Sequence, residues 1–483
     1  MDTLPAELVY TIVKRADSLT LPVLRCVNNQ WHVFTDTAGA HHRHRVHPHK
    51  RQADRNHVCT LNARCATRYA HGLIAQGRWL LLDWMVDCCV GDNHQKSVYD
   101  AACARAASVG DLQRLRRLPV HHLPRQAYEC AARYGHLHVL EWALERASIC
   151  DIAKWEAITG AAIARHAAEG GHIDILKWVV ARGLPRRFAC LAAARNGHLD
   201  VVKWARDNGS GWDSGTCAAA AEGGHLDVLH WLRSNGCPWD KETCTRAAEH
   251  GHLNILEWAH AQGCPANRMV CSHAAKSGYL RILQWARSHG YAWDAWTCMR
   301  AAGAGQMDVL QWARANGCPW SEGVCARAAY AGHLHILQWL KANGCPWSGD
   351  TCVSAARKGH LDILIWARVN GCPWGSEVMY MACINGHVAI LEWAHTHGCP
   401  PYGSLCTDAA NCGHLAVIEW ARAHGLPWDA RLYLMAACGG HLSVLKWARA
   451  NGCPMPDRNL FVSTATQYPP IRAWIDQQYA AAS

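Results

Sequence analysis

The chain has 483 residues, of which half are apolar and 18% are charged, and its formal net charge is +10 with histidine neutral. This composition excludes a largely disordered chain, because it offers enough apolar surface to build a core. No apolar run approaches the roughly 20 residues of a membrane span, and Asp2 and Glu7 interrupt the N-terminus where a secretory signal would be apolar. We therefore expect a soluble protein of a reducing intracellular compartment, the cytoplasm first and the nucleus as the alternative.

Residues 4–34 follow a pattern of their own, which predicts two or three short amphipathic helices. A segment of this size buries too little surface to fold alone, so it needs a partner or the residues that follow. The pattern LPxELVxxIV…LxLPxLRxVxxxW resembles the F-box, although Asn28 and Asn29 depart from it. The resemblance implies that residues 1–36 dock on the Skp-type adaptor of a cullin-RING ubiquitin ligase; the alternative is a helical cap on the first repeat. The docking residues would be Leu4, Pro5, Glu7, Leu8, Ile12, Leu21, Leu24, Val27 and Trp31.

Residues 37–64 form a linker rich in histidine and arginine, with its densest tract at residues 41–51. We expect this tract to be solvated. The alternatives are adventitious binding of a metal or an anionic surface, or a basic localisation signal.

A tryptophan recurs every 27 residues through more than half of the chain. A fixed period of this size indicates a solenoid, in which each small unit buries its apolar face only against its neighbours. We predict an all-α helical solenoid of about 15 helix-turn-helix units over residues 65–480, irregular over 65–165, regular over 166–456 and ending in a degenerate cap over 457–480. The periodic residues are Trp204, Trp231, Trp258, Trp285, Trp312, Trp339, Trp366, Trp393, Trp420, Trp447 and Trp474.

The unit at residues 240–266 shows how each repeat is built. Asp240 is suited to cap a first helix over 241–250, and a Gly-His turn leads to a second helix over 253–262. Gly263 then ends the second helix, because glycine adopts the left-handed conformation without a Cβ clash. Each unit is therefore expected to be helix, tight turn, helix and loop.

The motif AAxxGHLDVLxW, as at residues 220–231, resembles the ankyrin repeat. The period is shorter than that of the family, which has 33 residues, and the Thr-Pro-Leu-His opening is missing. The lost residues fall where ankyrin repeats carry a β-hairpin. The resemblance thus implies a protein-binding solenoid that uses a smoother helical surface instead of protruding hairpins.

The periodic tryptophans have two interpretations. They share a helix face with leucine and isoleucine, which favours a buried core spine over a surface that stacks nucleic-acid bases. A second set lies in the loop between repeats, and part of it could meet a ligand. This second set comprises Trp212, Trp239, Trp293, Trp320, Trp347, Trp374 and Trp428.

Other residue types recur with the same period. The cation in the last turn of the second helix, such as Arg314, is expected to offset the helix dipole, with attraction of an acidic partner as the alternative. The turn histidines stand about 8–10 Å apart on packed helices, too far to share a metal ion. Successive cysteines of one ladder are too distant for disulfides by the same argument. We expect buried thiols, locally bonded histidines, no metal and no cofactor.

No nucleophile–base pair, phosphate-binding loop or carboxylate pair stands apart from the repeat, so we expect no enzyme. Target contacts should come from first-helix positions that vary while the frame is constant, namely Arg246, His273, Arg300, Arg327, Ser354 and Tyr380. The leading hypothesis is a monomeric substrate receptor that brings an unknown target protein to a ubiquitin ligase, similar to F-box/ankyrin proteins of large DNA viruses. The alternative is an ankyrin-type binder that sequesters or scaffolds a partner. Nucleic acid is not expected as a partner, because no recognition helix or zinc finger accompanies the basic residues.

Overall fold

The computed structural model describes residues 92–118, 123–145, 160–184, 189–465 and 467–480, and every regular element within these ranges is an α-helix. The predicted all-α helical-repeat solenoid is confirmed. The F-box-like residues from Leu4 to Trp31 and the basic linker lie outside the described residues. No helix in the described ranges is long and apolar enough to cross a membrane.

The chain divides into two compact units, Met1–Pro238 and Trp239–Ser483. In each unit, first and second helices alternate along the chain. The helices of the first unit are α6 (Asp92–Ser108), α7 (Leu112–Arg117), α8 (Arg125–Arg133), α9 (Leu137–Glu145), α11 (Gly160–Gly170), α12 (Ile173–Ala181), α13 (Ala189–Arg195), α14 (Leu199–Asp207), α15 (Ser214–Gly223) and α16 (Leu226–Ser234).

The second unit continues the same alternation to the last described residues. Its helices are α17 (Lys241–His250), α18 (Leu253–Ala261), α19 (Met269–Ser277), α20 (Leu280–Ser288), α21 (Ala295–Gly303), α22 (Met307–Ala315), α23 (Glu322–Ala331), α24 (Leu334–Ala342), α25 (Gly349–Lys358), α26 (Leu361–Val369), α27 (Ser376–Ile384), α28 (Val388–Thr396), α29 (Leu405–Cys412), α30 (Leu415–Ala423), α31 (Arg431–Cys438), α32 (Leu442–Ala450), α33 (Arg458–Thr464) and α34 (Pro469–Ala480).

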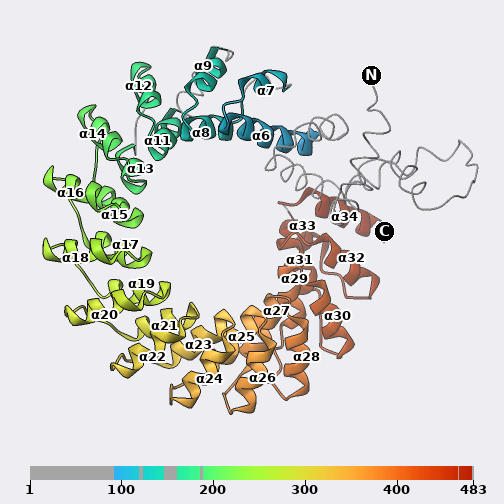
Figure 1. Cartoon of the computed structure of the whole chain (residues 1–483). Helices are drawn as coiled ribbons and strands as arrows, with labels where there is room; N and C mark the ends of the chain where they lie inside the picture. The colour runs from blue at the N-terminus through green and yellow to red at the C-terminus, as the bar shows by residue number, and fades with distance from the viewer. Residues whose placement is uncertain (1–91, 119–122, 146–159, 185–188, 466, 481–483) are drawn as a thin grey trace, which may run out of the picture. The chain divides into compact units, whose positions relative to one another are not determined.

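The first helices of successive repeats pack directly against one another within each unit. In the second unit α17 contacts α19, α19 contacts α21, α21 contacts α23 and α23 contacts α25, while each second helix packs on the first helix of its own repeat. Figure 1 shows this run of first helices, with the second helices on one side of them. The arrangement places residues 27 positions apart in the sequence on neighbouring helices.

Local sequence signals set the helix ends as predicted. The Asp240 carboxylate accepts a hydrogen bond from the backbone N–H of Glu242 at 2.9 Å and caps α17. Gly251 ends that helix at φ 89° and Gly263 follows α18 at φ 74°, both in the left-handed region that favours glycine.

Small residues in the first helices allow this close packing. The alanine pair Ala301–Ala302 of α21 is fully buried, and the absence of long side chains lets the backbones of α19, α21 and α23 approach. The second helix adds larger apolar groups, of which Leu310 is fully buried. Truncating such a leucine costs about 2–5 kcal/mol, so each repeat is stabilised by its own second helix and its neighbour's first.

The tryptophans of the second helices are shallower than predicted. Trp420 and Trp474 are buried, but the other members of the set, such as Trp312 and Trp339, are only half-buried. The prediction of a buried core spine is wrong in this respect. Alanine, leucine and isoleucine fill the core, and each indole is wide enough to extend from it to the surface.

Candidate functional site

The first helices place the predicted target-binding residues in one row. Arg246, His273, Arg300, Arg327 and Ser354 occupy equivalent positions on α17, α19, α21, α23 and α25, Tyr380 lies on α27 one residue before the equivalent Met381, and none of them is buried. Because these helices contact one another in sequence, their side chains form a continuous surface. We call it the first-helix face. Its charges differ from one part to the next.

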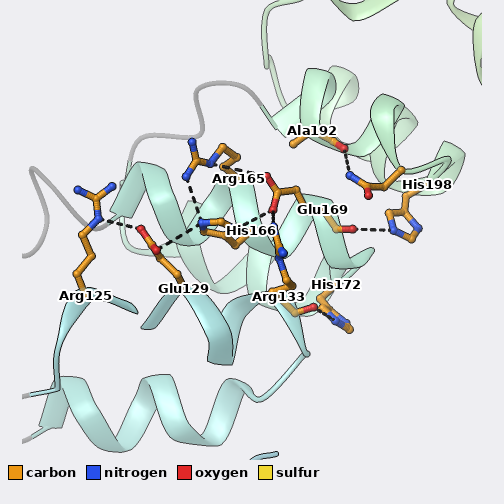
Figure 2. Close-up of polar contacts among 10 residues, drawn as sticks. Arg125, Glu129, Arg133, Arg165, His166, Glu169, His172, Ala192 and His198 are labelled. Atoms are coloured by element: carbon orange, nitrogen blue, oxygen red, sulfur yellow. Dashed lines mark hydrogen bonds and ion pairs between the residues drawn. The ribbon is translucent and has the colours of Figure 1, made fainter. Parts of the chain in front are cut away.

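In the first unit the corresponding first helices carry a network of opposite charges of their own. The Glu169 carboxylate on α11 accepts hydrogen bonds from Arg133 on α8 and from His166 Nδ1, the latter at 2.8 Å. Figure 2 shows these groups with Arg125, which donates to Glu129 at 2.8 Å. The cations of this region are therefore engaged by carboxylates of the same surface.

The network also sets the charge of its central carboxylate. Burial opposes ionisation of Glu169, but the hydrogen bonds from Arg133 and His166 outweigh this effect and hold its pKa below the ordinary glutamate value. Glu169 is thus an anion at neutral pH and offsets its cationic neighbours.

The same compensation is found at the start of the second unit, around Glu249 on α17. Its carboxylate lies 3.2 Å from Arg246 Nη1, 3.2 Å from His273 Nδ1 and 3.1 Å from Lys276 Nζ. Two of the predicted target-binding residues, Arg246 and His273, therefore already have an anionic partner within the protein.

The compensation stops at α21. The position of Glu249 is taken by Gly303 on α21, Tyr330 on α23 and Arg357 on α25. Four cations gather here, and none of them forms an ion pair with another described residue. Arg327, Arg357 and Lys358 are exposed and Arg300 is half-buried. We define the cationic face as Arg300, Arg327, Arg357 and Lys358.

Glycine and aromatic neighbours shape the cationic face. The side chain of Arg327 crosses Gly303 of the preceding helix, where a Cβ would come within 2.7 Å of Arg327 Cγ. Its guanidinium carbon lies 5.3 Å from the ring centre of Tyr330, and Lys358 Nζ lies 4.8 Å from the same ring. The nearest acidic side chains of α23 and α25, Glu322 and Asp350, are in the first helical turn at the opposite end, where the helix dipole favours a carboxylate.

The first-helix face loses its positive charge beyond α25. The rings of Tyr380 and Tyr402 pack with centroids 5.1 Å apart. The Tyr402 hydroxyl donates to Asp408 at 2.6 Å, and this hydrogen bond raises the pKa of Tyr402 to about 12. The predicted residue Ser354 is half-buried on α25 between these regions.

The periodic cations of the second helices have a structural partner that the sequence analysis did not identify. Arg314 lies 4.1 Å above the ring of the loop residue Trp320, which packs edge-to-face on Trp339 of the next repeat. The same cation–ring contact recurs at Arg206, Arg287, Lys341, Arg368 and Arg422. These cations join neighbouring repeats through the loop tryptophans, in addition to offsetting the helix dipole.

The turn histidines also join neighbouring repeats. The Nε2 atom of His414 lies 3.0 Å from the backbone carbonyl of Ile384, and His441 Nε2 lies 3.1 Å from that of Asn411. The predicted local hydrogen bonds therefore exist, but they connect one repeat to the preceding one. Among the described residues, no group of three or more histidine, cysteine, aspartate or glutamate side chains could hold a metal ion.

The two cysteine ladders meet within single repeats. Cys264 Sγ lies 3.5 Å from the backbone carbonyl of Asp240. A hydrogen bond with the Cys244 thiol, together with burial, raises the pKa of Cys264 well above its ordinary range. The described cysteines are free thiols and most are buried, so they act as small core residues.

No protein-family model and no curated protein matches the chain. Solved structures of the pentatricopeptide repeat protein PPR10 are similar to it. The complex of that protein with an 18-nt psaJ RNA element is 13% identical, has a TM-score of 0.31 and covers 99% of this chain and 79% of its own. A cysteine-to-serine variant in the same type of complex gives the same values. The PPR10 structure from maize is 13% identical, has a TM-score of 0.29 and covers 90% of this chain and 80% of its own.

These similarities concern the helical-repeat fold. They also correct one prediction: two of the three structures are complexes of a helical-repeat protein with RNA, which contradicts our reason for not expecting nucleic acid as a partner. That expectation relied on the absence of a recognition helix and a zinc finger, which are devices for reading duplex DNA. Their absence says nothing about the binding of RNA.

Proposed function

We propose that this chain is a helical-repeat binding scaffold, and that the cationic face of α21–α25 is its contact with an anionic macromolecule. The observation that carries the proposal is the change in charge compensation along one surface. Arg246 and Lys276 are paired with Glu249, whereas the four cations of the next three first helices have no carboxylate partner among the described residues. An external anion can supply the negative charge that the protein does not place beside these cations.

Elementary electrostatics supports this assignment. A unit charge pair at 4 Å gains about 1 kcal/mol in water, so a single exposed cation contributes little. Four cations on three packed helices act together on an extended partner, whereas an isolated small anion meets only one or two of them. Because the side chains are largely exposed, added salt screens the attraction over about 8–10 Å at physiological ionic strength. The partner should therefore be a polyanion, bound in a salt-dependent manner.

Chromatography on immobilised heparin tests the proposal without knowledge of the natural partner. The variant Arg327→Ala/Arg357→Ala removes two charges from the cationic face and should elute at lower salt than the parent protein. A matched control, Arg281→Ala/Lys446→Ala, removes two exposed cations from the second helices α20 and α32 and should elute with the parent. Equal shifts in the two variants would mean that net charge alone governs retention, and the proposal would fail.

A second candidate function rests on the N-terminal sequence pattern. The F-box-like residues, Leu4, Pro5 and Leu8 among them, support a role as substrate receptor of a cullin-RING ubiquitin ligase, in which the repeats would hold the molecule to be modified. A pull-down with the purified Skp-type adaptor tests it. Binding that is abolished by Pro5→Ala with Leu8→Ala supports this role; absence of binding, or binding that the double variant retains, rules it out.

A further inference from the structure

One tryptophan belongs to neither periodic set. Trp296 lies in the first turn of α21, and its side chain is 56% exposed. It is the only tryptophan among the described residues to be so exposed. More than half of this residue is open to solvent, so its indole is available to a partner that binds α21.

Trp296 is continuous with the cationic face. It is four residues before Arg300 on α21, a spacing that places two side chains on the same side of a helix. The adjacent helix α23 brings Arg327 across Gly303. Trp296 and Arg300 therefore share one side of α21, with Arg327 over the C-terminal end of the same helix at Gly303.

The surroundings of Tyr330 show that cationic side chains on this surface lie at stacking distance from an aromatic ring. Arg327 and Lys358 approach its ring at 5.3 and 4.8 Å, from α23 itself and from α25. Without a partner, the long side chains of Arg327 and Lys358 face the tyrosine ring. A flat group entering between them would meet a ring on one side and a positive charge on the other.

We infer that the cationic face binds a single-stranded nucleic acid. Arg300, Arg327, Arg357 and Lys358 would contact phosphates, and Trp296 and Tyr330 would stack on bases. This inference rests on the proposed polyanion-binding function and names the class of polyanion. A basic surface with aromatic side chains is the combination that binds single strands without reading their sequence.

The aromatic residues decide between nucleic acid and an acidic protein segment. An acidic polypeptide offers carboxylates to the four cations, but it offers a flat ring for the exposed indole of Trp296 only where it contains an aromatic residue, whereas a nucleic acid carries a base with every phosphate. A duplex offers phosphates, but its bases are stacked on each other and present only their edges. A single strand offers phosphates and unstacked base faces together, which matches both features of this surface.

Fluorescence anisotropy with the full chain can test the inference. The probes are labelled single-stranded RNA and DNA of about 16 nucleotides, a length at the upper end of single-module site sizes, a duplex of the same sequence, and polyglutamate of equal charge. We expect one or both single strands to bind more tightly than the duplex and the polyglutamate. For Arg327→Ala/Arg357→Ala, the slope of log affinity against log salt should fall by about 1.4, because each lost phosphate contact to a single strand contributes roughly 0.7.

The stacking contribution has its own variants. Trp296→Ala should weaken binding of the single strand about 5-fold or more, in the range measured for loss of one base–aromatic contact, and Trp296→Phe should restore most of it. Val369→Ala, at an apolar residue of α26 that is 79% exposed, is the matched control and should bind like the parent. The slope of affinity against salt reports the phosphate contacts, and the loss of affinity in Trp296→Ala reports the base contact. The two measurements are independent.

The outcomes separate this inference from the proposed function. Equal or tighter binding of polyglutamate or duplex, with no effect of Trp296→Ala, would overturn the nucleic-acid inference and leave a general polyanion surface. Failure of every probe to bind at low salt would overturn both. A preference between the RNA and DNA strands would identify which single strand is the ligand.

Discussion

Replacing Gly386 with alanine tests why the Gly-His turns require glycine. Gly386 has φ 76°, and a Cβ there would lie 2.8 Å from Nδ1 of His414 in the next repeat. Gly398 has the same φ of 76° at the end of the following second helix, but a Cβ there would meet no atom within 4 Å. The two sites thus share their backbone conformation and differ in the inter-repeat contact.

The expected magnitudes follow from this difference. A left-handed conformation costs a residue with a Cβ about 1–2 kcal/mol, and Gly398→Ala should lower the free energy of unfolding by that amount. Gly386→Ala should add the displacement of the His414 ring and the loss of its 3.0 Å contact with the Ile384 carbonyl, a hydrogen bond worth about 0.5–1.5 kcal/mol net. Its total is then roughly 1.5–3.5 kcal/mol.

Urea unfolding followed by circular dichroism measures both variants, with the midpoint and slope reported separately because solenoids can unfold in segments. His414→Ala provides the control. Once the ring is removed, alanine at position 386 should cost no more than alanine at position 398. Equal destabilisation of the two single variants in the parent background would refute the idea that the histidine contact fixes the turn.

Three further predictions concern stability and reactivity. Arg314→Ala should lower the unfolding free energy by about 0.5–1 kcal/mol through loss of its contact with Trp320, measured by urea unfolding; no change would mean that this cation is only solvated. Iodoacetamide at pH 8 should label the exposed Cys438 before the buried Cys190, because burial raises the pKa of Cys190 to about 11, and mass spectrometry of the peptides should show the difference; equal labelling rates would contradict it. The lowered pKa of Glu169 means that its ionised form stabilises the fold above the ordinary value of 4.5, and this contribution is lost as the pH falls through the lower folded-state value. Acid titration of Glu169→Gln should therefore show a smaller loss of stability below pH 4.5 than the parent, and parallel curves would show that the carboxylate is not linked to folding.

Much of the fold could be predicted because its signals are local. Asp240 at a helix start, Gly263 after a helix end and the Gly-His turn act within a few residues, and the structure gives α17 the predicted bounds Lys241–His250. The period itself required a stacked architecture, since one repeat cannot bury its apolar face alone.

The candidate site was predicted only in part. The sequence placed Arg246 and Arg300 at equivalent positions and gave them the same expected role. The structure distinguishes them, because Arg246 meets Glu249 at 3.2 Å and Arg300 forms no ion pair with a described residue. Trp296 was not predicted as a site residue, because the candidate residues were chosen from the repeating positions. Its place outside both tryptophan sets was the signal that could have identified it.

The sequence by itself determined the repeat, its helices and the residues that face away from the core, since these depend on spacing along one chain. Only the tertiary structure decided how deeply each indole lies, which cation stacks on which tryptophan, and where the first-helix face lacks carboxylates. These properties depend on contacts between different elements, from Arg314 with the loop residue Trp320 to Glu249 with Lys276 of the next repeat. Such contacts form only when elements pack, and the replacement of Glu249 by Gly303, Tyr330 and Arg357 at the equivalent positions leaves the cations of α21–α25 without a carboxylate partner among the described residues.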